Sequence, residues 1–428
     1  MSKSNISGIL IFLSFIVSIY AYFFQKELLL LSGIFAWSAF ILLFGSLKNK
    51  KFLWSLFILS FFAFLICFVN DYKIDFIKVF TVNQYLLTLL IGVGFLRLIA
   101  TPKKTKVKEL PKGKKSFLKT YFGVHLFGSV INLSSLILVA DKMYKKASLS
   151  TLQVVLLTRA FASDAYWSPF FVAFAAAITY APNLNTFVIL INGLFLAIIG
   201  FLITYIEVKK DKDFNIDEFR GYPISFDTLY LPFILAFLVL LTHSIFPDIK
   251  VIVLISVFSI SLTLIVLPIK KGFFKAKIKF KNHVLEELPK MKTEISLFLV
   301  AGMFGILVGS ILLGLNLSLP FDTFDWIIAS ILLAIFIILG FVGIHPIITI
   351  AVVGDFLSGV NHTLLAITFL MAWATTVSTS PFSGLNLTMV ARYNCDAKEI
   401  FKLNIFYAFK MYVVCIVCLF ILSNYFSL

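Results

Sequence analysis

Apolar segments of about 17 to 25 residues follow one another along almost the whole 428-residue chain. That is the length an α-helix needs to cross the ~30 Å hydrocarbon core of a bilayer. The composition agrees, because 60% of the residues are hydrophobic and only 14% are charged, against about 25% charged in soluble domains. The connectors are too short for a soluble domain of typical size. The sequence therefore predicts an all-α polytopic membrane protein, and neither a soluble enzyme nor a nucleic-acid partner is expected.

Eleven membrane-spanning helices and two re-entrant hairpins are predicted in an inverted repeat. The uninterrupted spans cover residues 6–24, 28–46, 52–69, 83–100, 186–206, 228–246, 251–269, 295–315 and 403–426. Spans 150–180 and 363–391 contain polar strips with a proline, and we expect each to be a broken helix. The hairpins are 117–140 and 325–358. The depth of the second stays open, because 34 residues can also make two short crossings.

The distribution of basic residues supports this topology. With the N-terminus in the cytoplasm and the C-terminus outside, the cytoplasmic connectors hold 30 of the 37 Lys and Arg residues and the outside connectors hold four. Such an excess is the usual mark of the cytoplasmic side. If 117–140 crossed the bilayer, its two Lys-rich flanks would lie on opposite sides. We therefore interpret 117–140 as a hairpin in a protein of the cell (inner or cytoplasmic) membrane.

Two matching signatures divide the chain into halves. Gly123-Val124-His125 is followed by Ser168-Pro169-Phe170, and Gly343-Ile344-His345 is followed by Ser380-Pro381-Phe382. The order and spacing indicate a duplication. The predicted divisions are a first half 1–206, a cytoplasmic linker 207–227 and an inverted second half 228–428. Inverted repeats with discontinuous helices are the usual build of secondary transporters.

The hairpin tips and helix breaks supply the candidate site, because unwound backbone and polar side chains within a membrane can coordinate solutes and ions. The predicted substrate-binding residues are Asn132, Ser134, Arg159, His345, Thr349, Ser380 and Asn386. The predicted coupling-ion residues, for Na⁺ or H⁺, are Ser163, Asp164, Ser168, Asp355, Ser378 and Thr379. Simple proline kinks are the alternative for both breaks.

Charged residues within spans allow more than one interpretation. Asp164 is predicted either to bind the coupling ion or to pair with Arg159, while Arg159 could instead hold a carboxylate of the substrate. Asp355 could also lie near the outer surface. His125 and His345 occupy equivalent places in the two hairpins, and either a titrating role or a structural hydrogen bond is open. His243, His283 and His362 receive no role.

No cofactor is expected beyond the coupling ion. The chain has no G-x-x-x-x-G-K-[ST] loop for ATP, so the energy for transport would come from an ion gradient. The four cysteines, Cys67, Cys395, Cys415 and Cys418, show neither a zinc-binding nor a disulfide pattern. We expect them to serve packing or to face lipid.

Eleven spans with a repeated hairpin and broken helix resemble the ion transporter superfamily, which includes divalent anion:sodium symporters, citrate carriers, arsenite permeases and NhaD-type antiporters. The Ser-Asn-Thr of the dicarboxylate members is absent, because the tips read Ser129-Val130-Ile131-Asn132-Leu133-Ser134-Ser135 and Gly343-Ile344-His345-Pro346-Ile347-Ile348-Thr349. The resemblance implies carrier architecture and a homodimer, and it gives no support for a dicarboxylate substrate.

These patterns predict a secondary active transporter that moves a small, anionic solute by alternating access, with Na⁺ or H⁺ as the coupling ion. The first alternative is a Na⁺/H⁺ antiporter on the same fold. A membrane-embedded enzyme acting on lipid is the second, but it would need a cluster such as DDxxD or HxxxH, and the sequence has none. The expected partners are the solute or ion and the lipid bilayer.

The topology is testable by labelling. In a Cys-free background, single cysteines at Lys108 and at Lys145 are both expected to resist a membrane-impermeant maleimide added outside, because positive-inside places both connectors in the cytoplasm. Labelling of only one of the two would show that residues 117–140 span the membrane.

Overall fold

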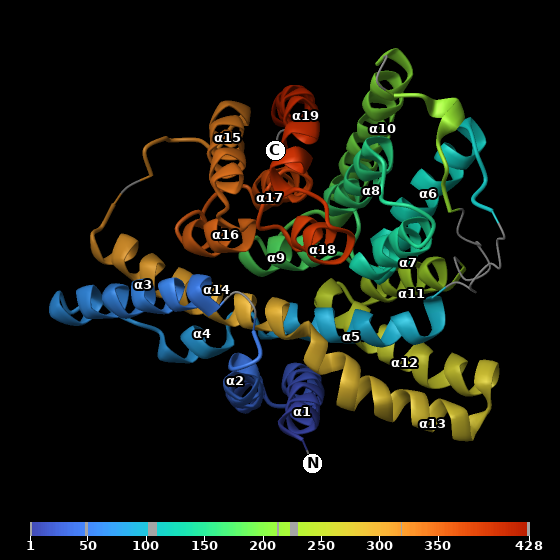
Figure 1. The fold of residues 1–428 in the computed structure, drawn as a ribbon. Helices are drawn as coiled ribbons and strands as arrows, with labels where there is room; N and C mark the ends of the chain where they lie inside the picture. The colour runs from blue at the N-terminus through green and yellow to red at the C-terminus, as the bar shows by residue number, and fades with distance from the viewer. Residues whose placement is uncertain are drawn as a thin grey trace. The chain divides into compact units, whose positions relative to one another are not determined.

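The computed structural model shows an all-helical chain (Figure 1). It describes residues 2–47, 50–101, 109–211, 214–222, 230–317 and 319–425. Within these ranges there is no β-strand. An isolated antiparallel bridge joins Lys112 and Arg220. Lys108 and residues 212–213 and 223–227 of the predicted linker 207–227 fall outside the described residues.

Among the described residues, eight helical segments are long and apolar enough to cross a membrane. They are Lys3–Phe23, Lys26–Phe44, Lys50–Val69, Phe76–Ala100, Thr186–Lys210, Val251–Lys271, Phe273–Gly314 and Ala397–Tyr425. Shorter apolar helices cover Phe233–Ile245, Trp326–Val342 and His362–Val377. The chain is therefore a multi-pass membrane protein by length and composition, and the predicted number of eleven spans remains a prediction.

Tertiary contacts divide the chain into two units that alternate along the sequence. Unit 1 comprises Met1–Ala100, Leu231–Pro320 and Ile347–Gly359, and unit 2 comprises Thr101–Tyr230, Phe321–Pro346 and Val360–Leu428. Both predicted halves contribute to both units. The two units defined by contacts thus do not coincide with the two halves predicted from the sequence. The repeat remains a prediction.

Unit 1 is built from long helices packed in pairs. Its helices are α1 (Lys3–Phe23), α2 (Leu29–Phe44), α3 (Lys50–Val69), α4 (Phe76–Thr81), α5 (Gln84–Ala100), α11 (Tyr230–Ile245), α12 (Val251–Lys271), α13 (Phe273–Asn282), α14 (Lys292–Gly314) and α16 (Pro346–Gly354). Helix α1 packs on α2, α5 on α12 and α3 on α14. A buried polar contact joins α1, α2 and α5, where the Ser32 hydroxyl lies 3.2 Å from Gln84 Oε1 and donates to the Ser14 carbonyl at 2.8 Å. The helices of unit 1 are thus joined by hydrogen bonds inside an apolar core.

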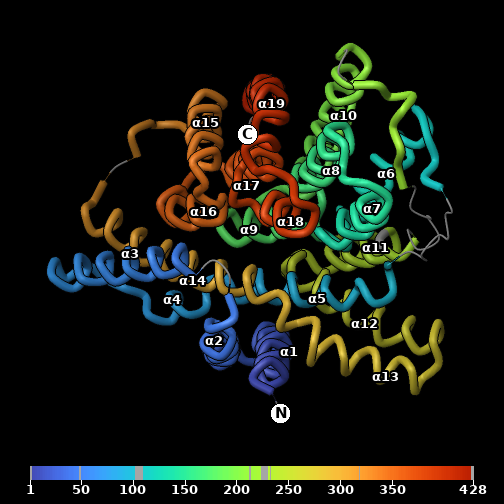
Figure 2. Tube along the Cα trace, in the orientation of Figure 1, coloured from blue at the N-terminus to red at the C-terminus, as the bar shows by residue number. Residues whose placement is uncertain are grey.

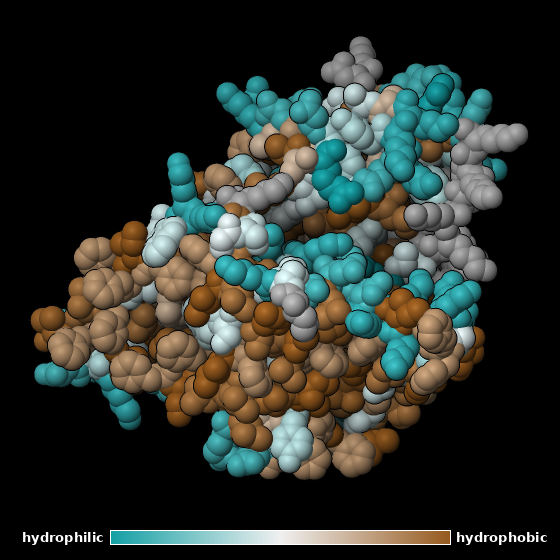
Figure 3. All heavy atoms as spheres, turned by 60° about the horizontal axis from the view of Figure 1, so that its bottom comes forward, coloured by the Kyte–Doolittle hydropathy of each residue, from teal (hydrophilic) through white to brown (hydrophobic). Residues whose placement is uncertain are grey.

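Apolar side chains also cover the outside of unit 1. Figure 3 shows a broad hydrophobic surface on the side of unit 1 formed by the helices labelled α1, α2, α12 and α13 in Figure 1. Exposed apolar residues in unit 1 include Ile41, Trp54, Phe62, Ile265 and Phe273. Apolar exposure on this scale is what a lipid-facing surface requires.

Unit 2 contains the predicted hairpin tip of the first half and both predicted helix breaks. Its elements are α6 (Lys114–Ile131), α7 (Leu133–Tyr144), α8 (Thr151–Ala162), the 3₁₀ turn η2 (Ser163–Tyr166), α9 (Val172–Tyr180), α10 (Thr186–Lys210), the 3₁₀ turn η3 (Ile216–Glu218), α15 (Trp326–Val342), α17 (His362–Val377), α18 (Gly384–Tyr393) and α19 (Ala397–Tyr425). Helices α8, α10 and α17 pack on one another. Helix α19 packs on all three.

The first hairpin turns at Asn132, inside the predicted tip that reads from Ser129 to Ser135. Asn132 has φ 51°, and it separates α6 from α7. Asparagine is one of the few residues that tolerate a positive φ. The Ser135 hydroxyl donates to the Val124 carbonyl at 3.3 Å, which joins the two arms just past the turn. The sequence therefore placed this turn correctly.

Both predicted breaks are present as interruptions of helix (Figure 2). The first runs from η2 to the start of α9, and the second separates α17 from α18. Pro169 and Pro381 lie in these gaps, where the missing N–H and the bulk of the ring prevent a continuous helix. Ser383 then caps α18 by accepting from the Asn386 N–H at 3.1 Å. Sequence and structure agree on the place of both interruptions.

The second predicted hairpin, 325–358, divides at Pro346. Its first arm, α15, belongs to unit 2, and most of its second arm, α16, belongs to unit 1. Helix α16 packs closely on α14, where a Cβ added at Gly305 would lie 2.5 Å from the Ala351 carbonyl oxygen. Gly343 ends α15 with φ 104°, a backbone conformation that favours glycine. The two arms therefore take their packing from different units.

Polar caps explain why several predicted boundaries are close to the observed ones. The side chains of Ser150, Asn185, Asp325 and Asn361 each accept from backbone N–H groups at the start of a helix. The last span is an exception, because it was predicted from 403 and α19 begins at Ala397. Asp396 accounts for the difference by accepting from the Lys398 N–H at 2.7 Å.

The packing of η2 on α10 gives a prediction about stability. A Cβ added at Gly193 would lie 2.2 Å from the Tyr166 carbonyl oxygen. Because backbone cannot move aside cheaply, Gly193→Ala is expected to destabilise the protein by about 1–3 kcal/mol and to lower its melting temperature. Gly45→Ala is the matched control, since nothing lies within 4 Å of its added Cβ. Equal melting temperatures for the two variants would contradict this packing.

Candidate functional site

The first helix break is held against the tip of the first hairpin. Asn132 donates from Nδ2 to the Phe170 carbonyl at 3.3 Å, and the Ser168 hydroxyl donates to the Ser129 carbonyl in a short hydrogen bond. These bonds satisfy carbonyl groups that the interruption and the turn leave without helical partners. Asn132 and Ser168, both predicted site residues, thus join hairpin to break.

Asp164 and His125 form a buried pair beside this junction. Asp164 Oδ1 lies 2.7 Å from His125 Nδ1, and the two side chains are 0% and 11% exposed. The Ser163 hydroxyl lies 3.0 Å from the same ring nitrogen. Among the described residues, no hydrogen-bond donor is aligned on either carboxylate oxygen of Asp164. A carboxylate that is completely buried and so incompletely satisfied is unusual and is typical of functional sites.

The carboxylate of Asp164 also depends on a glycine in α6. A Cβ added at Gly128 would lie 2.1 Å from Asp164 Oδ2. Only glycine leaves room for the carboxylate to approach the hairpin this closely. The hairpin and the break are therefore matched in shape as well as by hydrogen bonds.

The second break is lined by neutral polar groups. Asn386 donates from Nδ2 to the carbonyls of Ser378 and Ser380 at 3.3 and 2.9 Å. The Thr379 hydroxyl donates back to the Thr375 carbonyl at 3.1 Å. The Asn386 Oδ1 atom is buried and has no hydrogen-bond partner among the described residues. The break thus holds an acceptor that remains available.

The structure brings the two breaks together inside unit 2. Helix α17, which leads into the second break, packs on both η2 and α9, which flank the first. The Tyr166 hydroxyl lies 3.3 Å from Thr375 Oγ1, and both groups are buried. Polar strips that are 200 residues apart in sequence therefore share one region of the fold.

The repeated signatures also make matching contacts. The rings of His125 and Trp167 lie 5.8 Å apart, and those of His345 and Trp373 lie 5.1 Å apart. In the second half, an added Cβ at Gly343 would lie 2.3 Å from the ring of Phe382. In both halves the glycine–histidine signature thus lies against the broken helix that follows it in sequence.

Arg159 has a different partner from the ones considered from the sequence. Its guanidinium pairs with Glu207, and it donates to Asn404 Oδ1 at 3.0 Å and to the Leu403 carbonyl at 2.9 Å. It also lies 4.4 Å from the centre of the Tyr407 ring. The alternative salt bridge between Arg159 and Asp164 is therefore wrong, because Arg159 pairs with Glu207 and the close neighbour of Asp164 is His125. The role of Arg159 in substrate binding stays a prediction. In this structure the N–H groups of its guanidinium already have protein partners.

The remaining predicted residues are divided between the units. Ser134 and His345 lie in unit 2 with both breaks, whereas Thr349 and Asp355 lie in unit 1. Thr349 is buried, and Asp355 is partly exposed next to Gly309. The structure thus groups eleven of the predicted residues in the unit that holds the breaks, and two in the other.

Sequence reasoning left out three residues that the structure places at these clusters. His125 is recognised from the repeat but is not among the predicted site residues, and Trp167 has no predicted role. Glu207 follows the predicted end of span 186–206, but α10 continues to Lys210 and keeps Glu207 partly buried. The sequence does point to Glu207, because it is an acid that directly follows the predicted span 186–206.

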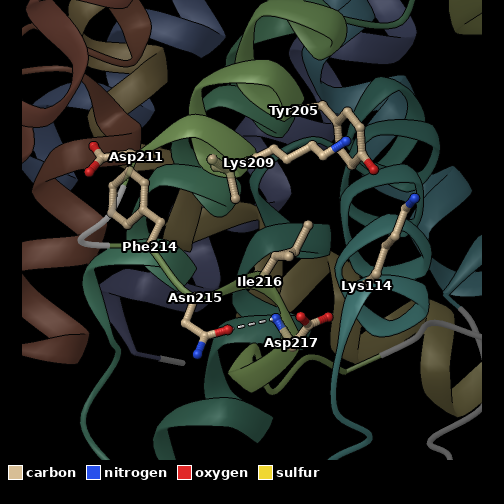
Figure 4. Close-up of a pocket in the computed structure, with 9 residues that line it drawn as sticks. Lys114, Tyr205, Lys209, Asp211, Phe214, Asn215, Ile216 and Asp217 are labelled. Carbon is tan, nitrogen blue, oxygen red and sulfur yellow. Dashed lines mark hydrogen bonds between the residues drawn. The ribbon is translucent and has the colours of Figure 1, made fainter.

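A separate cavity of about 430 Å³ lies at the end of α10, away from the breaks in sequence (Figure 4). It is lined by Lys114, Tyr205, Val208, Lys209, Asp211, Phe214, Asn215, Ile216 and Asp217. Lys114 Nζ lies 5.5 Å from the centre of the Tyr205 ring, and Asn215 Oδ1 accepts from the Asp217 N–H at 3.1 Å. None of the predicted site residues lines this cavity.

The Arg159 cluster gives a second prediction about stability. Glu207→Gln leaves the buried guanidinium without its counter-charge, and removal of one partner of a buried pair typically costs about 3–5 kcal/mol. The exposed side of Glu207 reduces that figure, so we expect a loss near the lower end. Arg159→Lys is also expected to destabilise, because an ammonium cannot replace a planar fork. Thermal unfolding of both single variants and of the double variant should show non-additive losses, and additive losses would contradict the pairing.

Comparisons with known proteins give a likeness in structure but none in sequence. No family model matches the chain, and no curated protein matches its sequence. Among solved structures it is similar to the YdaH transporter of Alcanivorax borkumensis, whose crystal structure is described as having an unusual topology. The TM-score is 0.49 at 12% sequence identity, over 80% of this chain and 85% of that chain.

Proposed function

We propose that this protein is a secondary active transporter that moves a small polar solute across the cytoplasmic membrane by alternating access, with Na⁺ or H⁺ as the coupling ion. One observation carries the proposal: two interrupted helices pack together in unit 2, and each interruption holds a buried polar group without a hydrogen-bond partner among the described residues. Unsatisfied buried groups of this kind are costly inside a membrane protein. A solute or ion that binds there would offset that cost.

The two breaks suggest separate roles for ion and solute. Asp164 supplies the only carboxylate at the first break, which suits a cation or proton. The second break offers Asn386, Ser378, Thr379 and Ser380, which are neutral groups suited to hydrogen bonding a solute. The anionic solute predicted from the sequence depended on Arg159, whose donors have protein partners. Uptake measurements with both anionic and zwitterionic solutes will show which charge the transported solute carries.

The alternative is a Na⁺/H⁺ antiporter in which Asp164 binds the two ions in turn. Asp164 as the lone carboxylate of the break favours this alternative, because a single acid is sufficient for exchange. Addition of Na⁺ to proteoliposomes in the absence of any other solute separates the two functions. Release of internal protons indicates exchange, whereas no pH change indicates that a solute is needed.

Ligand binding at the second break is testable with purified protein. Detergent-solubilised protein is heated with carboxylates, amino acids and inorganic ions, with and without Na⁺, and a ligand is recognised by a raised melting temperature. Asn386→Ala and Ser380→Ala are expected to weaken that ligand by about 1–3 kcal/mol, the cost of leaving a buried polar partner unpaired. Asn424→Ala, at an exposed amide near the end of α19, should bind like the parent protein.

Two results would contradict the proposal. The first is the same ligand-induced shift in Asn386→Ala, Ser380→Ala and the parent, which would place the ligand elsewhere. The second is a ligand that binds but is not accumulated by proteoliposomes under either a Na⁺ or an H⁺ gradient. Monodisperse elution of each variant from a sizing column serves as the check on folding.

A further inference from the structure

His125 and Asp164 face each other from different elements across the junction of hairpin and break. His125 lies on α6, and Asp164 lies in η2, where the first broken helix changes from α-helix to 3₁₀ turn. His125 Nδ1 and Asp164 Oδ1 lie 2.7 Å apart, close enough for the two groups to share a proton. Both groups are buried, so a proton held between them is shielded from bulk water.

The surroundings of the carboxylate suit a proton better than a metal cation. Hard cations such as Na⁺ are bound by sets of oxygen atoms. Here one carboxylate oxygen lies 2.7 Å from an imidazole nitrogen, and the other occupies the place that a Cβ at Gly128 would need. An imidazole can exchange a proton with a carboxylate but adds a competing positive charge near a bound cation.

The second ring nitrogen of His125 connects the pair to the unwound segment. Trp167 donates from Nε1 to His125 Nε2 at 3.3 Å. Nε2 is therefore an acceptor, and in the neutral ring the proton lies on Nδ1, which faces Asp164, Ser163 Oγ and the Ala160 carbonyl. A second proton on the ring would bring two donors face to face at Nε2. Trp167 must then turn away, and it lies in the gap between η2 and α9.

We propose that His125 and Asp164 together bind one proton, that H⁺ is the coupling ion of this transporter, and that Trp167 changes position when the pair is protonated. This inference rests on the proposed transport function. The pair has a net charge of −1 with a neutral ring and an ionised carboxylate, and binding of one proton brings it to zero. The transporter can change between its two conformations at lower cost when this buried pair is neutral. The same proton leaves to the opposite aqueous side.

Three ion pairs account for some of the other charges on the elements packed around α6 and η2. Arg159 on α8 pairs with Glu207 on α10, Asp141 on α7 pairs with Arg392, and Glu218 on η3 pairs with Lys112. The further titratable side chains on these elements are Lys114, Lys115, Lys119, Tyr121, Lys142, Tyr144, Tyr166, Tyr180, Tyr205, Lys209, Lys210, Asp217 and His362. Tyr166 is hydrogen-bonded to Thr375. His125 is thus the only imidazole next to Asp164 among the described residues.

Trp167 provides a readout that needs no known substrate. Indole emission of the detergent-purified protein is recorded as the pH is lowered, because a protonated imidazole quenches a neighbouring indole. We expect a transition in the parent protein that is absent from Trp167→Phe and His125→Gln. In Asp164→Asn the carboxylate no longer favours the charged ring, so the midpoint should move to lower pH by about 1 unit or more. His243→Gln is the matched control, since His243 contacts the Ile249 carbonyl in unit 1.

The competing ion is tested in the same experiment. Replacing choline by Na⁺ at constant pH is expected to leave the emission of the parent unchanged. A Na⁺-induced change that disappears in Asp164→Asn would overturn the inference, as would a pH transition that survives in His125→Gln. If His125→Gln does not elute as a monodisperse species, His125→Asn and the midpoint of the nearly isosteric Asp164→Asn decide the result.

Transport measurements then separate this inference from the proposed function. Uptake of a ligand found by the thermal screen is driven in proteoliposomes by a pH gradient alone or a Na⁺ gradient alone. Uptake driven only by Na⁺ overturns H⁺ coupling and leaves the transporter function standing. A pH transition at His125 together with no uptake under either gradient overturns the transporter function and leaves the proton-binding pair standing.

Discussion

A helix that stops inside an apolar environment leaves N–H and C=O groups without partners, and the organisation of unit 2 follows from that constraint. Side chains from the turn of the first hairpin serve the first break, as when Asn132 binds the Phe170 carbonyl. At the second break, Asn386 on the following helix α18 donates to the carbonyl groups of Ser378 and Ser380. Polar residues are therefore concentrated where helices end, and the same residues form the candidate site.

Burial of charge separates structural from functional groups in this unit. Arg159 is almost completely buried, but Glu207, Asn404 and the Leu403 carbonyl satisfy its guanidinium. Asp164 is equally buried, and the ionisable partner recorded for it is the imidazole of His125. A buried charge with full hydrogen bonding is structural, whereas a buried charge with few partners is stabilised when it binds a proton or an ion. The sequence could not make this distinction, because both residues appear there only as charges within an apolar span.

Local signals explain what could be predicted from the sequence. Pro169 and Pro381 located the breaks, and Asn132 lay inside the predicted turn, because both effects act within a few residues. Helix caps such as Asn361 fixed the starts of helices for the same reason. The partners of Arg159 and Asp164 lie up to 245 residues away in sequence, and no periodicity reports such contacts. The division of α15 and α16 between two units was also hidden, because each arm is apolar enough to pack on any neighbour.

The two breaks resemble each other in backbone but differ in chemistry, and the difference bears on how transport would be coupled. Both lie against a hairpin histidine whose ring contacts a tryptophan of the broken helix. The first has Asp164 next to its histidine, while the second break has the amide of Asn386 and three hydroxyl groups. The predicted duplication would permit this separation, since one copy could keep an ionisable pair while the other loses it. Because α17 packs directly on η2, a change in the charge of the first break would alter the surface against which the second is held. Ion and solute would then influence each other through the contact between Tyr166 and Thr375 without sharing a ligand.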